Sequence, residues 1–253
     1  MSITRRQLQI ALGLLWLLDG GLQLQPFMWG TGFATQVIAP AANGQPDLIA
    51  RPIRWSADVI AAHPLGWDLL FAATQLLIGL ALLVPRAARL ALAASLAWSL
   101  GVWIFGEGLG GLAAGGATLQ GGAPGAAFLY GLLAAAAWPH RDGRTAPPAD
   151  WLPIAWAVLW VGGAVLQALA GEPAANTVAL VTAEALIGLA ALHPKGRPFA
   201  AAAGFVFALV MWVVSQDLGG LFTGRATDPN SGPLIALMAV ALLAPRATSG
   251  TAR

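Results

Sequence analysis

Eight apolar segments separated by short polar stretches constrain the fold of this chain more than any other feature. A helix needs about 20 apolar residues to cross ~30 Å of hydrocarbon. Only 9% of the 253 residues are charged, whereas a soluble domain carries about a quarter. We therefore predict an all-α, polytopic membrane protein. Its eight spans are expected at residues 8–25, 65–84, 88–105, 123–139, 151–170, 175–193, 198–215 and 232–245.

The basic residues are divided unevenly between the loops on the two sides of this predicted membrane protein. With the N-terminus in the cytoplasm, ten basic residues lie inside, and only Arg51, Arg54 and Arg225 lie outside. This asymmetry follows the positive-inside rule, so we predict cytoplasmic termini in a plasma membrane, the inner membrane of a bacterium. The start ITRRQLQIALGLLWLL imitates an export signal. Because no small-residue cleavage site follows, we interpret it as a retained first helix.

The second half of the sequence resembles the first. An offset of 109 residues pairs LIGLALLVPR with LIGLAALHPK, WIFGEGLGGLAAGGAT with WVVSQDLGGLFTGRAT, and Pro124 with Pro233. Residues 75–124 and 184–233 share twenty identities in fifty positions without a gap. Earlier in the chain, LLWLLDGGLQ pairs with VLWVGGAVLQ at an offset of 144. This similarity predicts a gene duplication that produced two four-helix repeats.

Each predicted repeat has four spans, so both would enter the membrane in the same direction, as parallel repeats do. We place the first repeat at residues 1–138, a cytoplasmic linker at 139–150 and the second repeat at 151–253. The first repeat alone carries an outer-loop insert at about 27–64. Within it, IRWSADVIAA is expected to form an amphipathic helix with Trp55 and Ile60 toward lipid. The insert would act as a lid or a spacer.

The four-span unit, which opens with ALGLLWLLDGGLQLQP and continues with QLLIGLALLVPR, resembles the DoxX/DoxD-type integral membrane proteins. Those are small four-helix proteins, one of which is the membrane subunit of a thiosulfate:quinone oxidoreductase. The resemblance implies two fused four-helix units over nearly the whole chain and a redox-linked membrane setting. It transfers no catalytic residue. The doubling and the GEGLGGL segment depart from the family's simple pattern.

Two carboxyl groups are expected inside spans, where an ionisable group costs roughly 2.5–3.5 kcal/mol on insertion scales and usually faces the bundle interior. They are Asp19 in the first span and Glu184 in the sixth. Their counterparts in the other repeat are Gly163 and Gln75. Each acid could form a proton or cation site or bond to a quinone head group. Each could equally hold helices together as a protonated or amide-paired carboxyl.

Polar residues also gather where the third and seventh spans end. Glu107 and Asp217 lie there, Thr118 and Thr227 follow, and the second repeat adds Arg225 and Asp228; Gln23 and Gln167 are expected at the same level. The set predicts either an outer vestibule or a water-facing ion cluster. The next spans, the fourth and eighth, are short and begin with proline. Their free N–H groups would suit an anion or a polar head group, unless the glycines before them serve only close packing.

Several function classes are excluded by residue type. The chain has no cysteine, which excludes disulfides and thiolate metal sites. The three histidines, His63, His140 and His193, lie at span ends or in loops, which argues against haem, and we predict no metal site. No basic stretch suits nucleic acid. Most of the eleven tryptophans are expected to form interfacial belts. Trp103 and Trp212 match between the repeats but are still best interpreted as anchors.

Three functions remain. The first is a subunit or accessory protein of a redox-linked membrane system that binds a quinone-like lipid or a small oxyanion at the outer face, with no covalently bound cofactor. The second is a small-solute transporter with its site between the repeats. The third is a non-catalytic scaffold that packs against other membrane subunits in the lipid bilayer. Whether the chain is an enzyme stays open. The candidate ligand-binding residues are Asp19, Gln75, Trp103, Glu107, Thr118, Glu184, Trp212, Asp217, Arg225 and Thr227.

Overall fold

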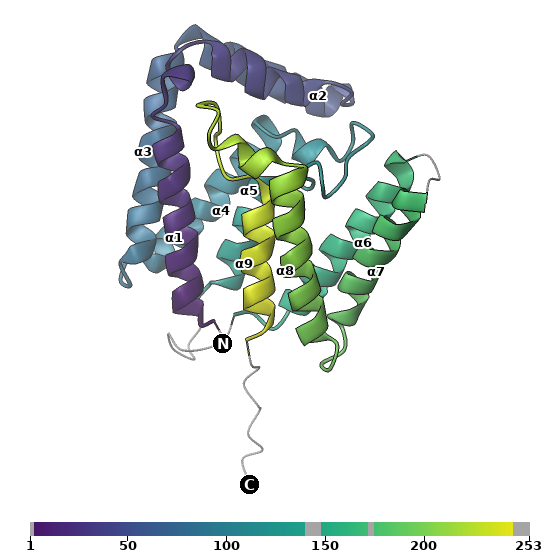
Figure 1. Cartoon of the computed structure of the whole chain (residues 1–253). Helices are drawn as coiled ribbons and strands as arrows, with labels where there is room; N and C mark the ends of the chain where they lie inside the picture. The colour runs from purple at the N-terminus through teal and green to yellow at the C-terminus, as the bar shows by residue number, and fades with distance from the viewer. Residues whose placement is uncertain (1–2, 140–147, 172–174, 245–253) are drawn as a thin grey trace.

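A computed structural model describes residues 3–139, 148–171 and 175–244, and the regular structure of these residues is entirely helical (Figure 1). The predicted all-α class is confirmed. Each of the eight predicted spans overlaps one helix, and α2 lies in the predicted insert. The α-helices are α1 (Arg5–Leu22), α2 (Asp47–Ala62), α3 (Pro64–Leu83), α4 (Ala88–Phe105), α5 (Ala126–Ala136), α6 (Leu152–Ala170), α7 (Ala175–Ala190), α8 (Arg197–Val214) and α9 (Ser231–Leu242). Five short turns of 3₁₀ or π helix are η1 (Pro26–Trp29), η2 (Ala34–Ile38), η3 (Ala39–Ala42), η4 (Leu109–Gly111) and η5 (Asp217–Gly220).

Four of the described helices, α3, α4, α6 and α8, are long and apolar enough to cross a membrane. Their outward faces carry large apolar side chains. Leu77, Val158 and Val206 are each at least 60% exposed. A broad apolar surface of this kind fits lipid and is uncommon on a soluble monomer. These helices are consistent with a membrane protein.

Glycines bring the first helices of each half close together. Helix α1 packs against α3, and a Cβ added to Gly79 would lie 2.8 Å from the carbonyl oxygen of Gly13. Helix α6 packs against α7, where Gly188 meets the Cβ of Trp160. Small residues allow helix backbones to approach in this way. The remaining helices pair as α4 with α5 and α8 with α9, so residues 3–139 (the first half) and 148–244 (the second half) pair their helices in the same order.

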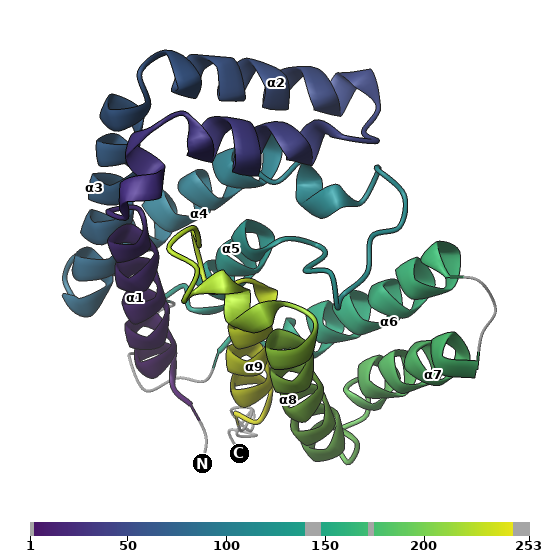
Figure 2. The same cartoon turned by 45° about the horizontal axis from the view of Figure 1, so that its top comes forward.

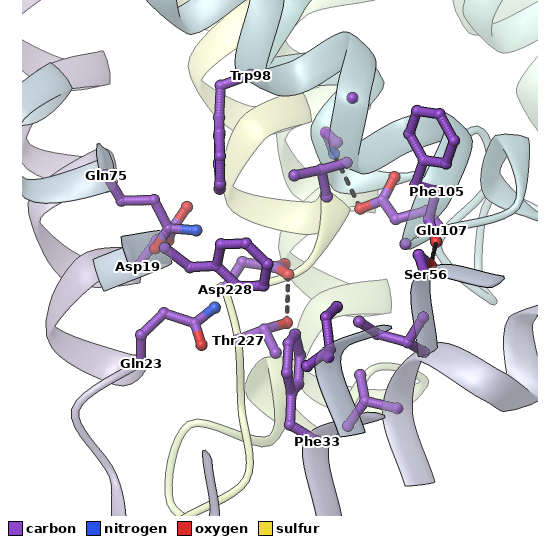
Figure 3. A pocket seen from close by; sticks show the side chains of 18 of the residues that line it. Asp19, Gln23, Phe33, Ser56, Gln75, Trp98, Phe105, Glu107, Thr227 and Asp228 are labelled. Carbon is purple, nitrogen blue, oxygen red and sulfur yellow. Dashed lines mark hydrogen bonds between the residues drawn. The ribbon is translucent and has the colours of Figure 1, made fainter. Parts of the chain in front are cut away.

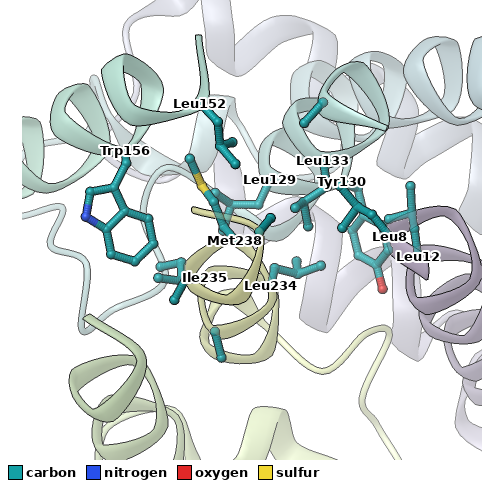
Figure 4. Packing of buried hydrophobic residues seen from close by; sticks show 14 of the residues in the cluster. Leu8, Leu12, Leu129, Tyr130, Leu133, Leu152, Trp156, Leu234, Ile235 and Met238 are labelled. Carbon is teal, nitrogen blue, oxygen red and sulfur yellow. The ribbon is translucent and has the colours of Figure 1, made fainter. Parts of the chain in front are cut away.

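The short helices α5 and α9 form the centre of the bundle (Figures 1 and 4). They contain 11 and 12 residues, so each is only about 16–18 Å long. Their shortness agrees with the sequence-based prediction. Both are mostly buried, and they share one hydrophobic cluster with α1 and α6, which includes Leu8, Leu12, Leu129, Leu133, Trp156, Leu234, Ile235 and Met238. A short helix is sufficient here because other helices, and not lipid, surround it.

The insert folds into a cap with a hydrophobic cluster of its own, formed by residues of η1, η2, η3 and α2 such as Met28, Phe33, Ile53 and Ile60. In Figure 2 α2 lies alongside the preceding turns and above the ends of other helices. The predicted amphipathic helix is present and longer than expected. The prediction that Ile60 faces lipid is wrong, because Ile60 is only 6% exposed. Trp55 is 60% exposed.

The expected tryptophan belts are also wrong for several positions. Trp16, Trp156 and Trp160 are at most 3% exposed. Trp156 and Trp160 contact each other, with ring centroids 5.5 Å apart, where α6 faces the bundle. These indoles fill the interior beside small residues such as Gly204, whose missing Cβ leaves room for Trp156. Large aromatic side chains therefore contribute to the core and not only to an interface.

Candidate functional site

A cavity of about 360 Å³ lies beneath α2 in the first half of the molecule. Its walls come from α1, α3, α4, α5, α2 and η2, and residues 227–228 of the second half complete it (Figure 3). The volume is within the usual range for a small-molecule site. We call this space the α2 cavity.

Aromatic side chains form most of the wall of the α2 cavity. Phe71 is the centre of one group, with ring centroids 5.4 Å from Trp98, 5.9 Å from Trp67 and 6.3 Å from Phe33. The other aromatic residues of the lining are Trp16, Trp55, Phe105 and Tyr130. Such a wall buries a large apolar body and offers π faces to it.

The α2 cavity is closed on one side by hydrogen bonds between the insert and the end of α4. Ser56 donates its hydroxyl proton to the carbonyl oxygen of Phe105 at 2.7 Å. The amide nitrogen of Gln45 donates to the carbonyl oxygen of Gly108, also at 2.7 Å. The cap is therefore attached to the residues next to Glu107. It covers the cavity as the predicted lid would.

Polar groups without partners gather at the inner end of the α2 cavity. Asp19 is 2% exposed, and its Oδ1 has no hydrogen-bond partner in the described structure. The same is true of the amide oxygens of Gln23 and Gln75, which are also buried. A buried polar atom left unpaired costs about 1–3 kcal/mol. Groups that face a cavity can recover this energy by bonding to a ligand or to water.

Glu107 lies at the junction between the cavity and α5. Its Oε1 accepts a hydrogen bond from the backbone N–H of Ala127 at 3.0 Å, in the first turn of α5, whereas its Oε2 has no partner. Gly125, with φ of 103°, lets this carboxyl approach, because a Cβ there would collide with Oε2. Burial, reinforced by the nearby Asp228 carboxyl, raises the pKa of Glu107 to about 8. The carboxyl is therefore mainly protonated at neutral pH.

Asp228 reaches the α2 cavity from the second half. Its carboxylate accepts hydrogen bonds from the Thr227 hydroxyl at 2.8 Å and from the backbone N–H of Asn230 at 2.7 Å. Burial raises the pKa of Asp228, and these two bonds oppose the rise. Figure 3 shows Asp228 between the Asp19 side and the Glu107 side of the cavity. Three carboxyl groups from distant parts of the sequence thus share one site.

The structure brings together only some of the predicted site residues. Asp19, Gln75, Glu107 and Thr227 line the α2 cavity, together with Gln23 and Asp228 of the expected vestibule. The other candidates lie outside its lining: Trp103, Thr118, Glu184, Trp212, Asp217 and Arg225. Asp217 is exposed, and exposed Arg225 lies 5.1 Å from the ring centroid of Phe27 in the cap.

Trp103 and Trp212 have matching structural roles. The indole N–H of Trp103 donates to the carbonyl oxygen of Pro124 at 2.7 Å, and that of Trp212 donates to the carbonyl oxygen of Pro229 at 2.8 Å. Each bond joins the end of a long helix to the residues just before the following short helix. Pro124 and Pro229 therefore have the same structural role, whereas the ungapped alignment pairs Pro124 with Pro233. Pro124 also precedes α5, which begins at Ala126, so it does not lie in the first helical turn as expected.

The side chain that caps the short helix is also matched. Gln216 accepts a hydrogen bond from the backbone N–H of Gly232 in the first turn of α9 at 3.1 Å, as Glu107 does from Ala127 in α5. Leu109 and Leu218 follow at φ of 57° and 54°, a left-handed conformation that is unusual for leucine. We name this arrangement the corner: a tryptophan, a capping Glu or Gln and a left-handed turn. In the first half, four residues separate Leu119 from Pro124, whereas in the second half Asp228 is followed directly by Pro229.

Glu184 lies in a different environment from Asp19. Its Oε1 accepts a hydrogen bond from the amide nitrogen of Gln120 at 2.8 Å. Beside it, Leu119 is 1% exposed and occupies the space that a Cβ of Gly163 would need. Gly163 is the predicted counterpart of Asp19. In the second half, therefore, the Leu119 side chain fills the space that corresponds to the cavity beside Asp19 in the first half. Glu184 fits the interpretation of an amide-paired carboxyl that holds helices together.

The two outer loops cross between the halves. Residues 221–230 reach the first half, where the amide nitrogen of Gln25 donates to the carbonyl oxygen of Ala226 at 3.0 Å. Leu119 and Gln120, in the loop before α5, reach α6 and α7 in the second half. Each half therefore supplies two residues to the interior of the other: Thr227 and Asp228 in one direction, Leu119 and Gln120 in the other.

Sequence reasoning missed most of the aromatic lining. Trp16, Trp98 and Tyr130 lie within apolar segments, where a tryptophan or tyrosine is usually a belt or packing residue. Spacing offers no signal that separates them. The indole N–H of Trp98 has no partner in the described structure, a property that only the packing reveals.

Comparison with protein-family models, curated proteins and solved structures found no match. The resemblance to DoxX/DoxD-type proteins therefore stays a prediction. Any functional conclusion rests on the site itself.

Proposed function

We propose that the chain is a multi-span membrane protein that binds an amphiphilic small molecule in the α2 cavity. The observation that carries this proposal is the combination of an aromatic wall with unpartnered, buried oxygens at Asp19, Gln23 and Gln75. Sites for small molecules are typically apolar with a few convergent polar groups. The apolar body of the ligand would contact the aromatic residues, and its head group would bond to the polar end.

The proposed architecture is eight membrane helices in two parallel repeats with cytoplasmic termini. The shared helix pairing and the two corners support a duplication. The four extra residues after Leu119 explain why an ungapped alignment does not pair Pro124 with Pro229. The distribution of basic residues supports the orientation. In this orientation α2 and the cavity lie on the outer side of the plasma membrane.

A quinone-like lipid is the ligand that the family resemblance implies. The Trp98 indole and the Tyr130 hydroxyl are donors that suit its carbonyl oxygens, and a redox-linked system with partner subunits would supply its electrons. The alternative ligand, a small oxyanion, is less well supported by the charge of the site. Among the described lining residues three are carboxylic acids and none is Lys, Arg or His.

The substitution Gly101→Leu tests the proposal. Gly101 lines the cavity, and a Cβ added to it would meet no atom within 4 Å. A leucine would therefore fill the space without displacing the helix, which also gains propensity of about 0.5–1 kcal/mol. Fluorescence of the cavity tryptophans should report binding of aromatic amphiphiles, a short-chain quinone among them, to the purified wild-type chain. We expect Gly101→Leu to lose that binding.

The matched control is Gly162→Leu on α6. A Cβ at Gly162 also meets no atom within 4 Å, but this glycine does not line the cavity. The control should bind like the wild type. Absence of binding by the whole panel, or equal binding by Gly101→Leu and the wild type, would refute the proposal.

A transporter is a second candidate, because Asp228 brings the second half into a site formed mainly by the first. Movement between the halves would then change the site. Proteoliposomes would show solute flux that falls in Asp228→Asn and persists in Glu184→Gln. Flux that depends on Glu184 instead would place the transport site elsewhere.

A further inference from the structure

The ionisable side chains of the α2 cavity lining are all acids. Asp19 from α1, Glu107 from the corner after α4 and Asp228 from the loop before α9 are the ionisable acids of its lining, together with the phenol of Tyr130. The described lining contains no basic side chain. The arginines of the cap, Arg51 and Arg54, are exposed on α2. A buried site of this kind is suited to a positive charge supplied by a ligand.

Buried hydrogen-bond acceptors without partners accompany the acids of the cavity. Asp19 is 2% exposed with Oδ1 unpartnered, and the unpartnered amide oxygens of Gln23 and Gln75 add two further acceptors. Buried charges and acceptors without donors are costly unless something pairs with them. An ammonium group supplies the missing charge, and one with N–H bonds also supplies donors to these oxygens.

The aromatic wall favours the same ligand class. A cation within about 6 Å of an aromatic centroid gains about 0.5–2 kcal/mol, and tryptophan is the best partner. Four tryptophans, Trp16, Trp55, Trp67 and Trp98, line the cavity. A combination of carboxylates and aromatic rings is typical of sites for substituted ammonium ions. An uncharged quinone would use the aromatic wall but would leave the carboxyl groups without a partner of opposite charge.

We propose that the α2 cavity binds an organic cation, an ammonium group on an apolar aromatic or aliphatic body, with Asp19, Asp228 and Glu107 around the charge. This proposal rests on the proposed function and narrows its ligand class. Glu107 attracts the bound cation most strongly when its carboxyl is ionised. The groups that face it, Asp19, Asp228 and Tyr130, are acids too. Binding of a cation is therefore expected to release a proton from this cluster and to become tighter as the pH rises toward about 8.

The test compares three probes on the full chain in lipid nanodiscs. They are phenylbutyl-trimethylammonium, its uncharged tert-butyl isostere and a short-chain quinone. The ammonium probe is expected to bind at least about tenfold more tightly than the isostere, as one good cation–π or charge contact implies. This preference should increase between about pH 6 and pH 8.5, across the raised pKa of Glu107.

Variants locate the charge contact. Asp19→Asn and Asp228→Asn should each lower the affinity for the ammonium probe by about tenfold and leave the affinity for the isostere unchanged. Glu184→Gln removes a buried carboxyl outside the cavity lining and should affect neither probe. The comparison of the three probes uses the wild-type chain, so it still tests the cation proposal if a variant fails to fold.

The outcomes separate the two proposals. Equal binding of the ammonium probe and the isostere, or tighter binding of the quinone than of the ammonium probe, would overturn the cation proposal and leave an amphiphile site in place. Failure of all three probes would overturn the proposed function as well. A preference for the ammonium probe that survives both aspartate substitutions would also overturn the cation site described here.

Discussion

The two halves of this molecule share a corner and differ in what they place beside it. In the first half Asp19 and Asp228 face a cavity, and in the second half Leu119 covers Gly163. The positions correspond, since Leu119 and Asp228 each follow the Ala-Thr pair of their loop. One half thus keeps an open polar space, while an apolar side chain fills the equivalent space in the other.

The same corner therefore occurs beside a cavity in the first half and beside a filled space in the second. The corner needs only a tryptophan, a capping side chain and a left-handed turn. These hold α5 and α9 in the centre whether or not a cavity lies nearby. The crossing loops then determine which side chain lies in the interior of each half. The residue after the Ala-Thr pair comes from the opposite half: Asp228 enters the first half and Leu119 enters the second. The difference between the halves therefore depends on the residues that each loop supplies to the opposite half, on the Asp19 or Gly163 that they meet, and on the cap.

The largest expected effect is on the corner that both halves share. A Cβ at Gly110, where φ is 65°, would collide with the carbonyl oxygen of Pro124. Gly110→Ala should therefore move the α4–α5 connection and lower the free energy of unfolding by at least about 3–4 kcal/mol, from steric conflict and the left-handed backbone together. Unfolding in mixed micelles measures it.

The neighbour Gly111 provides the matched control. Its φ is 74°, but a Cβ there meets no atom within 4 Å. Gly111→Ala should cost only about 1–2 kcal/mol, the backbone contribution for an L-residue in this region. Equal losses for the two variants would show that contact with Pro124 does not define the corner.

The next effect concerns the filled half. Leu119→Ala would leave a space next to Gly163 and Glu184, and a buried leucine replaced by alanine costs about 2–5 kcal/mol. The same unfolding assay should show this loss. Leu112→Ala, in the same loop but 38% exposed, should cost less than about 1 kcal/mol. A neutral Leu119→Ala variant would contradict the description of the second half as closed packing.

At acid pH, where Glu107 is protonated, the smallest effect on stability is expected from Glu107→Gln, which gives the first corner the capping residue type of the second. Glu107→Gln should keep the bond to Ala127, because Gln216 already caps α9 in this way. The change should appear in the pH dependence. Since the folded pKa of Glu107 is raised to about 8 from an ordinary 4.5, its stabilising contribution is present at acid pH and is lost as the pH rises through about 8. The variant should therefore lose less stability than the wild type between about pH 5 and pH 8.5. An unchanged slope, measured by thermal unfolding at several pH values, would contradict the raised pKa.

The sequence predicted the elements better than their contacts. Apolar length and turn residues located the segments that contain α1 and α3 to α9, the insert helix and the shortness of α5 and α9. Asp19 could be identified because an ionisable residue is rare inside an apolar segment. Gln75 followed as the repeat counterpart of Glu184, and Glu107 and Thr227 because polar residues gather where the predicted spans end. Their meeting with Asp228 could not be predicted, since residues 19 and 228 come together only when a loop crosses between the halves. Because four extra residues follow Leu119, the ungapped alignment could not predict that Pro124 and Pro229 accept matching bonds from Trp103 and Trp212.

The aromatic residues show a second limit. Trp98 and Trp103 lie five residues apart on α4, yet Trp98 lines the cavity and Trp103 bonds to Pro124. Both are indoles in an apolar segment, so composition treats them alike. Only the packing of α3, α5 and the cap distinguishes a binding wall from a structural contact. Glu184 was predicted as a site residue for the same reason that Asp19 was, and each has one buried oxygen without a partner, but only Asp19 lines the α2 cavity.

An experimental density map of the chain in nanodiscs with the phenylbutyl-trimethylammonium probe tests the central claim most directly. We expect probe density beneath α2, with its charged end among Asp19, Asp228 and Glu107, and the Leu119 side chain against Gly163 in the second half. An α2 cavity closed by its own side chains, or probe density bound beside Glu184 instead, would contradict it.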